Sequence, residues 1–382
     1  MNPIKINQSA CGSGKTTDLI KTVKQEISEG ESVLIFSVSI KACADLKAHF
    51  PSAILVNSSN SRIPIKTQFK TAIKKSNLII ATHHMFHLLD SELIESADWI
   101  VHLDEEPKMF STKYTKVDKG AKVLVMREDS NEIEMCDVSS IDIVSVKPLA
   151  PFKLNWKSIT IYCAALMSTG IGRMFVKHNV PHTIISDFTK TDGSRITFKC
   201  PILPENCNKL SARLKQDDPR YITSMRREVP KDEPYIVARN SKDVSDGSAL
   251  EIQVPHNISG SNSERHINNV LIESTLNLSY VASAKAKEVF DCDEEGLMLM
   301  MGGHTYMQII NRCSIRDPSA KAKITVVCCP MIAKILCEHF FDGAKIEHFD
   351  KIKRRKSNKV AMTQTERNTK CKAKRLTKGD LK

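Results

Sequence analysis

The chain has 382 residues, of which 41% are hydrophobic and 26% charged. This length is enough for two ordinary domains, and the composition is that of a folded protein rather than a disordered one. No run approaches the roughly 18 apolar residues that a membrane span needs, and the N-terminus lacks the apolar stretch of a signal peptide. We therefore expect a cytoplasmic protein that does not cross a membrane.

The net charge of +12 is concentrated at the C-terminal end of the sequence. Residues 351–382 contain thirteen Lys or Arg and two acids, so the first 350 residues carry a net charge of only about +1. A run such as Lys353-Arg354-Arg355-Lys356 is typical of a solvated segment, and it also attracts polyanions such as nucleic acid. We expect residues 350–382 to form a basic, disordered tail that contacts nucleic acid.

The twelve cysteines are scattered along the chain, and none forms paired C-x-x-C units with zinc spacing. Cys328 and Cys329 are adjacent, so they are poorly placed to share one tetrahedral site. Buried, reduced thiols are the simplest interpretation, with a structural disulfide or zinc site as the alternative.

The first half of the chain alternates between short apolar runs and stretches with helical periodicity. Residues 16–29 predict a helix, because Leu19, Val23 and Ile27 recur at roughly helical spacing, and residues 40–50 predict a second one. The expected strands are 4–7, 32–38, 53–56, 78–82, 99–103 and 159–163. Apolar strands that alternate with helices predict an α/β fold in which a parallel sheet is covered on both faces.

Residues 114–146 interrupt this alternation with strand-like patches such as 122–126. We expect a hairpin-rich insertion within the first domain, spanning about 112–150, and assign it no role.

A second alternating unit begins near Ile184, and the domain boundary should fall near residues 166–180. Its expected strands are 235–238, 250–254, 270–273 and 324–327, and its expected helices are 282–290 and 305–313. The predicted domains are therefore 1–170 and 171–349.

Residues 9–17 read Ser-Ala-Cys-Gly-Ser-Gly-Lys-Thr-Thr, a Walker A loop with Ser9 in place of the usual first glycine. The glycines let the backbone curl so that successive N–H groups point at one phosphate, and the helix that follows adds its positive dipole end. Lys15 would neutralise the β- and γ-phosphates, and the Thr16 hydroxyl would bind Mg²⁺. The residues assigned to nucleotide binding are Gly12, Ser13, Gly14, Lys15, Thr16 and Thr17.

The apolar run 99–103 ends directly on Asp104-Glu105-Glu106-Pro107. Ligands bind at the carboxyl edge of an open parallel sheet, which is where these acids should lie. Asp104 would hold Mg²⁺ through water, and Glu105 would polarise the attacking water as a general base. The Asp-Glu pair predicts hydrolysis rather than phosphoryl transfer to a small molecule.

Gln308, Arg312 and Arg316 are four residues apart, so a helix would place all three on one face. Guanidinium groups fixed on one face suit the γ-phosphate of ATP bound to another domain, where they stabilise the charge of phosphoryl transfer. The alternative is a helix surface with solvated arginines. We expect Gln308, Arg312 and Arg316 to act in catalysis together with Lys15 and Glu105.

Taken in order, these segments resemble the superfamily 2 helicases of DEAD/DEAH-box type, in particular the helicase-like proteins carried on phages and plasmids. Residues 9–17 are similar to the family's motif I, 104–107 to its motif II and 308–316 to its motif VI. The resemblance covers roughly residues 1–340.

Weaker similarities concern nucleic-acid contacts. Ser37-Val38-Ser39 sits where motif Ia would touch phosphates, and Ala81-Thr82-His83 resembles a strand-end element that touches the nucleic-acid backbone. Residues 259–262, Ser-Gly-Ser-Asn, resemble motif V. The contacts that the resemblance implies are Ser37, Thr82, His83, Gly260 and Asn262.

The resemblance implies two RecA-like parallel-sheet P-loop domains in tandem and a nucleic-acid-dependent ATP hydrolase that uses ATP and Mg²⁺. We expect a helicase or translocase that acts on nucleic acid, DNA in preference to RNA, in replication or recombination, with a protein of that machinery as a partner. A phage or plasmid origin would place it in the host cytoplasm.

Two segments depart from the family pattern. Motif III is usually a Ser/Thr-Ala-Thr step, whereas Cys163-Ala164-Ala165 has no hydroxyl. In motif VI the arginines are four apart where many relatives have three, Asn311 replaces the common glycine, and of the two arginines we favour Arg316 as the catalytic one. Three alternatives therefore remain: a translocase that never separates strands, a P-loop NTPase that acts as a switch or packaging-type motor, and a non-catalytic nucleic-acid-binding protein.

Overall fold

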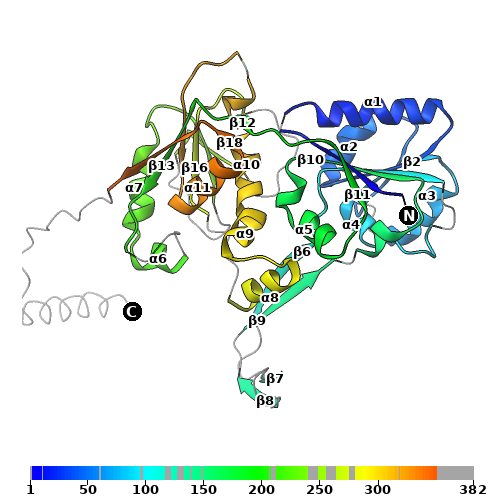
Figure 1. Ribbon diagram of the computed structural model, residues 1–382, viewed down its shortest axis with the longest axis horizontal. Helices are drawn as coiled ribbons and strands as arrows, with labels where there is room; N and C mark the ends of the chain where they lie inside the picture. Colours follow the sequence, from blue (N-terminus) through cyan, green and yellow to red (C-terminus); the bar gives the residue numbers. More distant parts are fainter. Residues whose placement is uncertain are drawn as a thin grey trace, which may run out of the picture.

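The computed structural model has two lobes, each built on a parallel β-sheet (Figure 1). It describes residues 2–10, 12–59, 62–94, 98–116, 122–126, 133–137, 140–147, 149–205, 207, 212–239, 248–254, 264–274, 280–317 and 319–350. Only the backbone is described for the strand residues within 111–145 and for 212, 213, 216, 280 and 281. Among the described residues, no helix combines the length and apolar character that a bilayer span requires.

The first lobe contains a sheet of seven strands in the order β11-β1-β10-β5-β2-β4-β3, and all neighbouring strands are parallel. Its strands are β1 (Ile4–Gln8), β2 (Ser32–Ser37), β3 (Ile54–Val56), β4 (Leu78–Thr82), β5 (Trp99–Asp104), β10 (Ser158–Cys163) and β11 (His182–Ser186). Its helices are α1 (Lys15–Ser28), α2 (Ile40–His49), α3 (Ile65–Ile73), α4 (His83–Phe86) and α5 (Gly170–Lys177), with short 3-10 helices at Ala150–Lys153 and Leu166–Ser168.

The central strand β2 explains why both faces of this sheet are covered. Successive side chains of a strand point to opposite faces. Leu34 and Phe36 therefore enter one hydrophobic core, and Val33 and Ile35 enter the core on the other face. The α/β fold with a parallel sheet that the apolar strands predict is confirmed.

The first lobe extends further along the chain than the sequence indicates. Strand β11 pairs with β1, so Ile184 belongs to the first sheet, and the expectation that a second unit begins there is wrong. Ile184 and Ile185 are 39% and 54% exposed, because β11 is an edge strand. The first sheet therefore includes residues beyond 170, the position that the sequence indicates for the boundary between the domains.

The described part of the insertion consists of two antiparallel strand pairs. Strand β6 (Phe110–Lys116) pairs with β9 (Ser140–Val146), and β7 (Lys122–Met126) pairs with β8 (Ile133–Asp137). Figure 1 shows the β6–β9 ribbon running away from the first lobe, with β7 and β8 at its far end.

The second lobe contains a sheet of six strands in the order β15-β14-β16-β17-β13-β19, again with parallel neighbours. Its strands are β13 (Ile196–Pro201), β14 (Tyr235–Ala238), β15 (Glu251–Gln253), β16 (Asn269–Ile272), β17 (Ile324–Val327) and β19 (Lys345–Phe349), and a separate short pair joins β12 (Thr191–Asp192) to β18 (Phe341–Asp342). The helices of this half of the chain are α6 (Ala212–Asp217), α7 (Arg220–Glu228), α8 (Tyr280–Phe290), α9 (Glu294–Met298), a π-helical turn (Leu299–Gly303), α10 (His304–Ile310), a 3-10 turn (Ser314–Arg316) and α11 (Pro330–His339).

Helix α8 crosses back to the first lobe. Ala286 and Phe290 are buried in the first-lobe core, and the Phe290 ring packs edge-on against Phe110, with 5.7 Å between the ring centroids. The Lys177 ammonium of α5 donates to the Glu288 carbonyl of α8. The lobes are therefore joined by packing as well as by the chain.

The helix expected over 305–313 ends at Ile310, so the prediction that Gln308, Arg312 and Arg316 share one helix face is wrong. Asn311 is the C-terminal capping residue, and its side-chain amide donates to the Met307 carbonyl at 2.9 Å. Asparagine often forms such local bonds at the point where a regular helix stops. Arg316 consequently lies in the separate 3-10 turn.

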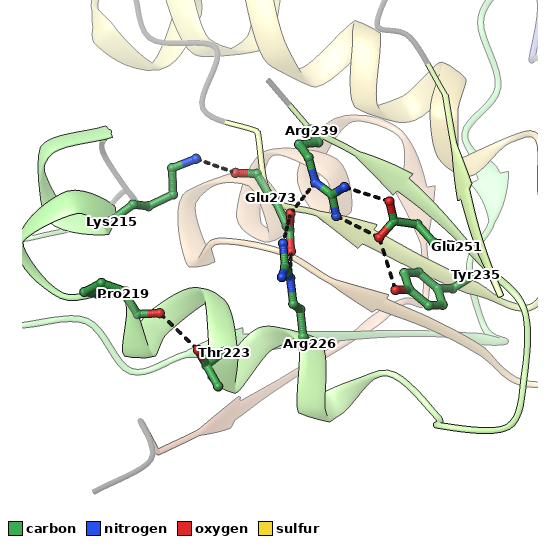
Figure 2. Close-up of polar contacts among 8 residues, drawn as sticks. All are labelled: Lys215, Pro219, Thr223, Arg226, Tyr235, Arg239, Glu251 and Glu273. Carbon is green, nitrogen blue, oxygen red and sulfur yellow. Dashed lines mark hydrogen bonds and ion pairs between the residues drawn. The ribbon is translucent and has the colours of Figure 1, made fainter. Parts of the chain in front are cut away.

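A buried ion-pair network joins neighbouring strands of the second sheet to α7 (Figure 2). Arg239, directly after β14, donates to Glu251 at 2.7 Å and to Glu273 at 2.8 Å, and Arg226 of α7 donates to Glu273 at 2.5 Å. The side chains of Arg239 and Glu273 are each 1% exposed. Lys215 also donates to the Glu273 main-chain carbonyl at 3.0 Å. The two guanidinium groups balance two carboxylates, which is how buried charge is usually tolerated.

Candidate nucleotide-binding site

The order of strands in the first sheet brings three loops to one edge. Strand β10 lies between β1 and β5, so the segments that follow these strands are neighbours. The Ser9 N–H donates to the Cys163 carbonyl at 3.1 Å, and the Glu105 N–H donates to the Tyr162 carbonyl at 2.8 Å. The carboxyl edge therefore combines the glycine-rich loop, the acidic segment and Cys163-Ala164-Ala165 in one place.

The glycine-rich loop has the backbone of an anion-binding loop. Gly12 and Gly14 have φ values of 83° and 94°, in the left-handed region that glycine adopts without strain. Helix α1 begins at Lys15, so its first N–H groups point toward the loop. The Lys15 ammonium donates to the carbonyls of Ser9 and Ala10, both at 2.9 Å. Cys11 lies outside the described residues, whereas Ser13 and Thr17 are exposed beside the loop.

Asp104 is held by two hydroxyl groups at the end of β5. Its carboxylate oxygens lie 3.4 Å from the Thr16 hydroxyl and 3.0 Å from the Ser37 hydroxyl. Burial raises the pKa of Asp104, while the bonds from Ser37 and Thr16 and the charge of Lys15 act in the opposite direction. Thr16 and Asp104 offer hard oxygen ligands, which is the donor chemistry that Mg²⁺ prefers, so these residues fit a magnesium ion.

Glu105 follows in an unusual conformation. Its φ of 69° lies in the left-handed region, which costs a non-glycine residue about 1–3 kcal/mol and is most often found at functional sites. Burial, followed by the charges of Glu106 and Asp104, raises the pKa of Glu105 to about 7. A carboxylate with a pKa near neutrality is suited to accept a proton from water.

The second lobe closes one side of the site. A cavity of about 390 Å³ is lined by both lobes. Its charged and polar lining includes Lys15, Thr16, Asp104 and Glu105 from the first lobe and Arg265, Gln308 and Arg316 from the second. A Cβ atom placed on Gly12 would lie 3.3 Å from the Arg316 Nε atom, so the Arg316 side chain lies against the glycine-rich loop.

The other residues predicted for catalysis take different positions. The Gln308 side-chain amide lies 3.5 Å from a carboxylate oxygen of Glu105. Arg312 is 3% exposed and is not part of the cavity lining, so of the two arginines only Arg316 lies beside the glycine-rich loop.

His304 also lies at this site, although the sequence did not indicate it. Its Nδ1 atom lies 2.9 Å from a Glu106 carboxylate oxygen, and its Nε2 atom lies 2.8 Å from the Ala164 carbonyl oxygen. His304 precedes Gln308 by four residues in α10, so both residues lie on the helix face that meets the acidic segment.

The residues predicted to contact nucleic acid are not all at the surface. Ser37 is fully buried with its hydroxyl on Asp104, so its position does not fit the predicted contact with phosphates. His83 is 7% exposed, and burial, followed by the neighbouring His87, lowers its pKa to about 4. Thr82 is partly exposed at the end of β4. Gly260 and Asn262 lie outside the described residues.

Comparison with solved structures identifies the fold that carries this site. The chain is similar to Xpd4 of S. tokodaii, with a TM-score of 0.52 and 11% identity over 91% of this chain and 96% of that one. It also matches S. cerevisiae Dbp5 bound to RNA and ADP BeF3, with a TM-score of 0.46 and 12% identity over 91% and 86% of the two chains. A third match is the helicase MrfA bound to DNA and AMPPNP, with a TM-score of 0.40 and 9% identity over 91% and 50%.

No family model matches the sequence. A search of curated proteins found no match either. The likeness is therefore one of fold: two lobes, each with a parallel sheet, as in Xpd4.

Proposed function

We propose that this protein is an ATP-dependent nucleic-acid helicase or translocase that hydrolyses Mg-ATP between its two lobes. The observation that carries the proposal is the position of Arg316, which reaches from the second lobe to the glycine-rich loop of the first. A nucleotide switch or a ring-shaped motor has no need of a second parallel-sheet lobe in the same chain to carry such an arginine. A two-lobed motor needs one, because it lets nucleotide binding and lobe closure depend on each other.

Each residue of the site has its own role in the proposed hydrolysis of ATP. The loop N–H groups and Lys15 bind the β- and γ-phosphates, and Thr16 and Asp104 are placed to hold Mg²⁺. A bound magnesium ion would neutralise charge on the phosphate oxygens. Glu105 accepts a proton from the attacking water. Arg316 stabilises the charge that develops on the transferred phosphoryl group.

The polymer that we propose is nucleic acid, with DNA preferred to RNA, in replication or recombination. The residues proposed to contact it are Thr82, Gly260 and Asn262, together with the basic segment 350–382. The positive charge of this segment suits contacts with phosphates, which do not depend on the base sequence. Aromatic residues are 5% of the chain, so stacking on bases contributes little.

A translocase that does not separate strands is the second candidate. It is favoured by Cys163-Ala164-Ala165, which has no hydroxyl where the superfamily usually has two. A single-turnover unwinding assay run beside an ATPase assay separates the two candidates, because only the helicase produces free single strands.

The decisive experiment measures ATPase rates of the full chain with no polymer, single-stranded DNA, duplex DNA and RNA. The wild type is compared with Lys15→Ala, which removes the phosphate-binding ammonium. We expect a polymer to stimulate the wild type and Lys15→Ala to remove activity under every condition. Hydrolysis that no polymer stimulates would contradict the motor and favour a switch. ATP binding without any hydrolysis would favour the non-catalytic alternative.

A further inference from the structure

The His304 side chain joins the two lobes at the acidic segment. It begins α10 in the second lobe, is 5% exposed, and contacts two groups of the first lobe. One is the Glu106 carboxylate at 2.9 Å and the other is the Ala164 main-chain carbonyl at 2.8 Å. Both ring nitrogens are thus used, and both reach across the boundary between the lobes.

Both partners of His304 are hydrogen-bond acceptors, and this determines the protonation state of its imidazole ring. A carbonyl oxygen cannot donate, and an ionised carboxylate cannot donate either, so both ring nitrogens must carry a proton. Burial alone would lower the pKa of His304, but the charge of Glu106 and its hydrogen bond raise it. The contact is a charge-assisted pair with a second bond to the backbone.

Each group that His304 contacts lies close in the chain to Glu105 or to its hydrogen-bond acceptor. Glu106 is the next residue in the chain, and Ala164 follows the strand whose Tyr162 carbonyl accepts the Glu105 N–H. Glu105 itself has the strained φ of 69°, so its position depends on such supports. One helical turn after His304, the amide of Gln308 lies 3.5 Å from the Glu105 carboxylate. The same face of α10 thus contacts both acids.

The segment Cys163-Ala164-Ala165 explains why the contact is made through the backbone. It offers no hydroxyl, and its two alanines are 3% and 5% exposed within the hydrophobic core of the second lobe. The Ala164 carbonyl is therefore the acceptor that this segment offers to His304.

We propose that His304 is a positioning residue that holds Glu105 in its reactive place only while the second lobe is docked, so that lobe closure switches hydrolysis on. The inference rests on the proposed function, because it assigns a role within ATP hydrolysis. His304 does not touch the nucleotide cavity, so it acts through Glu106 and the Ala164 carbonyl. The substitution His304→Phe keeps a ring beside Phe340 but removes both donors.

The test compares three substitutions of His304 in the full chain. Asparagine can keep a donor near the Nδ1 position and glutamine can keep one near Nε2, whereas phenylalanine keeps neither. We measure kcat with and without DNA, the affinity for a fluorescent ATP analogue with Mg²⁺, and the melting temperature. His348→Phe, an exposed histidine on β19, is the matched control.

We expect kcat of His304→Phe to fall about 10–100-fold, because a buried charge-assisted bond is lost, with partial recovery in His304→Asn and His304→Gln. Nucleotide affinity should stay within about threefold of wild type, because the phosphate loop lies in the first lobe. Glu106→Gln should lower kcat by a similar factor, which keeps the test valid if His304→Phe does not fold. Wild-type kcat in His304→Phe, or a loss of affinity as large as the loss of kcat, would overturn the proposal. A wild type without any ATPase activity would instead refute the proposed function, and the role of His304 with it.

Discussion

Arg316 and Gly12 belong to different lobes, yet a Cβ atom on Gly12 would lie 3.3 Å from the Arg316 Nε atom and 3.4 Å from its Cδ atom. The guanidinium group therefore lies beside the phosphate-binding loop, in the 3-10 turn that follows α10. Arg312 is 3% exposed and is not part of the cavity lining. The two arginines thus occupy different places, and of the two Arg316 lines the cavity beside the glycine-rich loop.

The first prediction concerns Arg316→Ala. We expect kcat for ATP to fall about 10³-fold, because an arginine that stabilises phosphoryl transfer contributes at least this factor. The affinity for Mg-ATP should change much less, since the first lobe supplies the loop that binds the phosphates. Steady-state ATPase assays and nucleotide titrations measure the two quantities. Arg227→Ala, an exposed arginine on α7, is the control, and retention of more than half of kcat by Arg316→Ala would refute the assignment.

A second prediction distinguishes two roles of Ser37, which are support of Asp104, as the structure indicates, and contact with nucleic acid, as the sequence indicates. Ser37→Ala removes a hydroxyl that donates to Asp104 at 3.0 Å, so the Mg²⁺ concentration needed for half-maximal ATPase should rise about tenfold. Nucleic-acid affinity should not change. Thr82→Ala is the matched variant, because Thr82 is the register partner of Ser37 on β4 and is partly exposed. Thr82→Ala should weaken nucleic-acid binding and leave the Mg²⁺ dependence of the ATPase unchanged. If Ser37→Ala instead weakened nucleic-acid binding without changing the Mg²⁺ dependence, the contact with nucleic acid that the sequence indicates for Ser37 would be correct.

Local signals in the sequence were enough to predict most strands of the first sheet. Apolar runs such as 32–37 predict buried parallel strands without knowledge of their neighbours. The glycine-rich loop and the acidic segment are each contiguous, so their residue types and spacing carry their chemistry. The geometry of Gly12, Gly14 and Asp104 agrees with what the spacing requires.

Features that depend on distant segments could not be predicted in the same way. The sequence places the start of the second unit near Ile184, but the pairing of residues 182–186 with β1 rather than with the second sheet is set by the tertiary fold. His304 shows the same limit within the site, since nothing near it in the sequence indicates that Glu106 and Ala164 will be its partners.

The third prediction concerns the ion-pair network of the second lobe (Figure 2). Among the described residues, Glu273→Ala leaves Arg239, whose side chain is 1% exposed, with Glu251 as its remaining carboxylate partner, and it removes the ion pair between Arg226 and Glu273. Breaking a buried pair from one side costs about 3–5 kcal/mol, because a charge stays buried without full compensation. Urea unfolding measures this free energy. Glu288→Ala, which breaks an exposed pair with Lys285, should cost less than about 1 kcal/mol, and equal costs for the two variants would show that the network is not stabilising.

The last prediction is a dependence of stability on pH that originates at His87. Burial, followed by the positive charges of Lys147 and His84, lowers the pKa of His87 to about 4. An unfolded chain, in which a histidine has a pKa of about 6.5, binds more protons than the folded one between pH 6.5 and 4, so stability falls as the pH falls through this window. His87→Gln does not titrate there, and its loss of unfolding free energy between pH 7 and 4.5 should be smaller than that of wild type by on the order of 2 kcal/mol. Urea unfolding followed by circular dichroism at a series of pH values measures the difference, and His348→Gln, at an exposed position, is the control. Parallel curves for wild type and His87→Gln would mean that His87 is solvated well enough to take up a proton in the folded state.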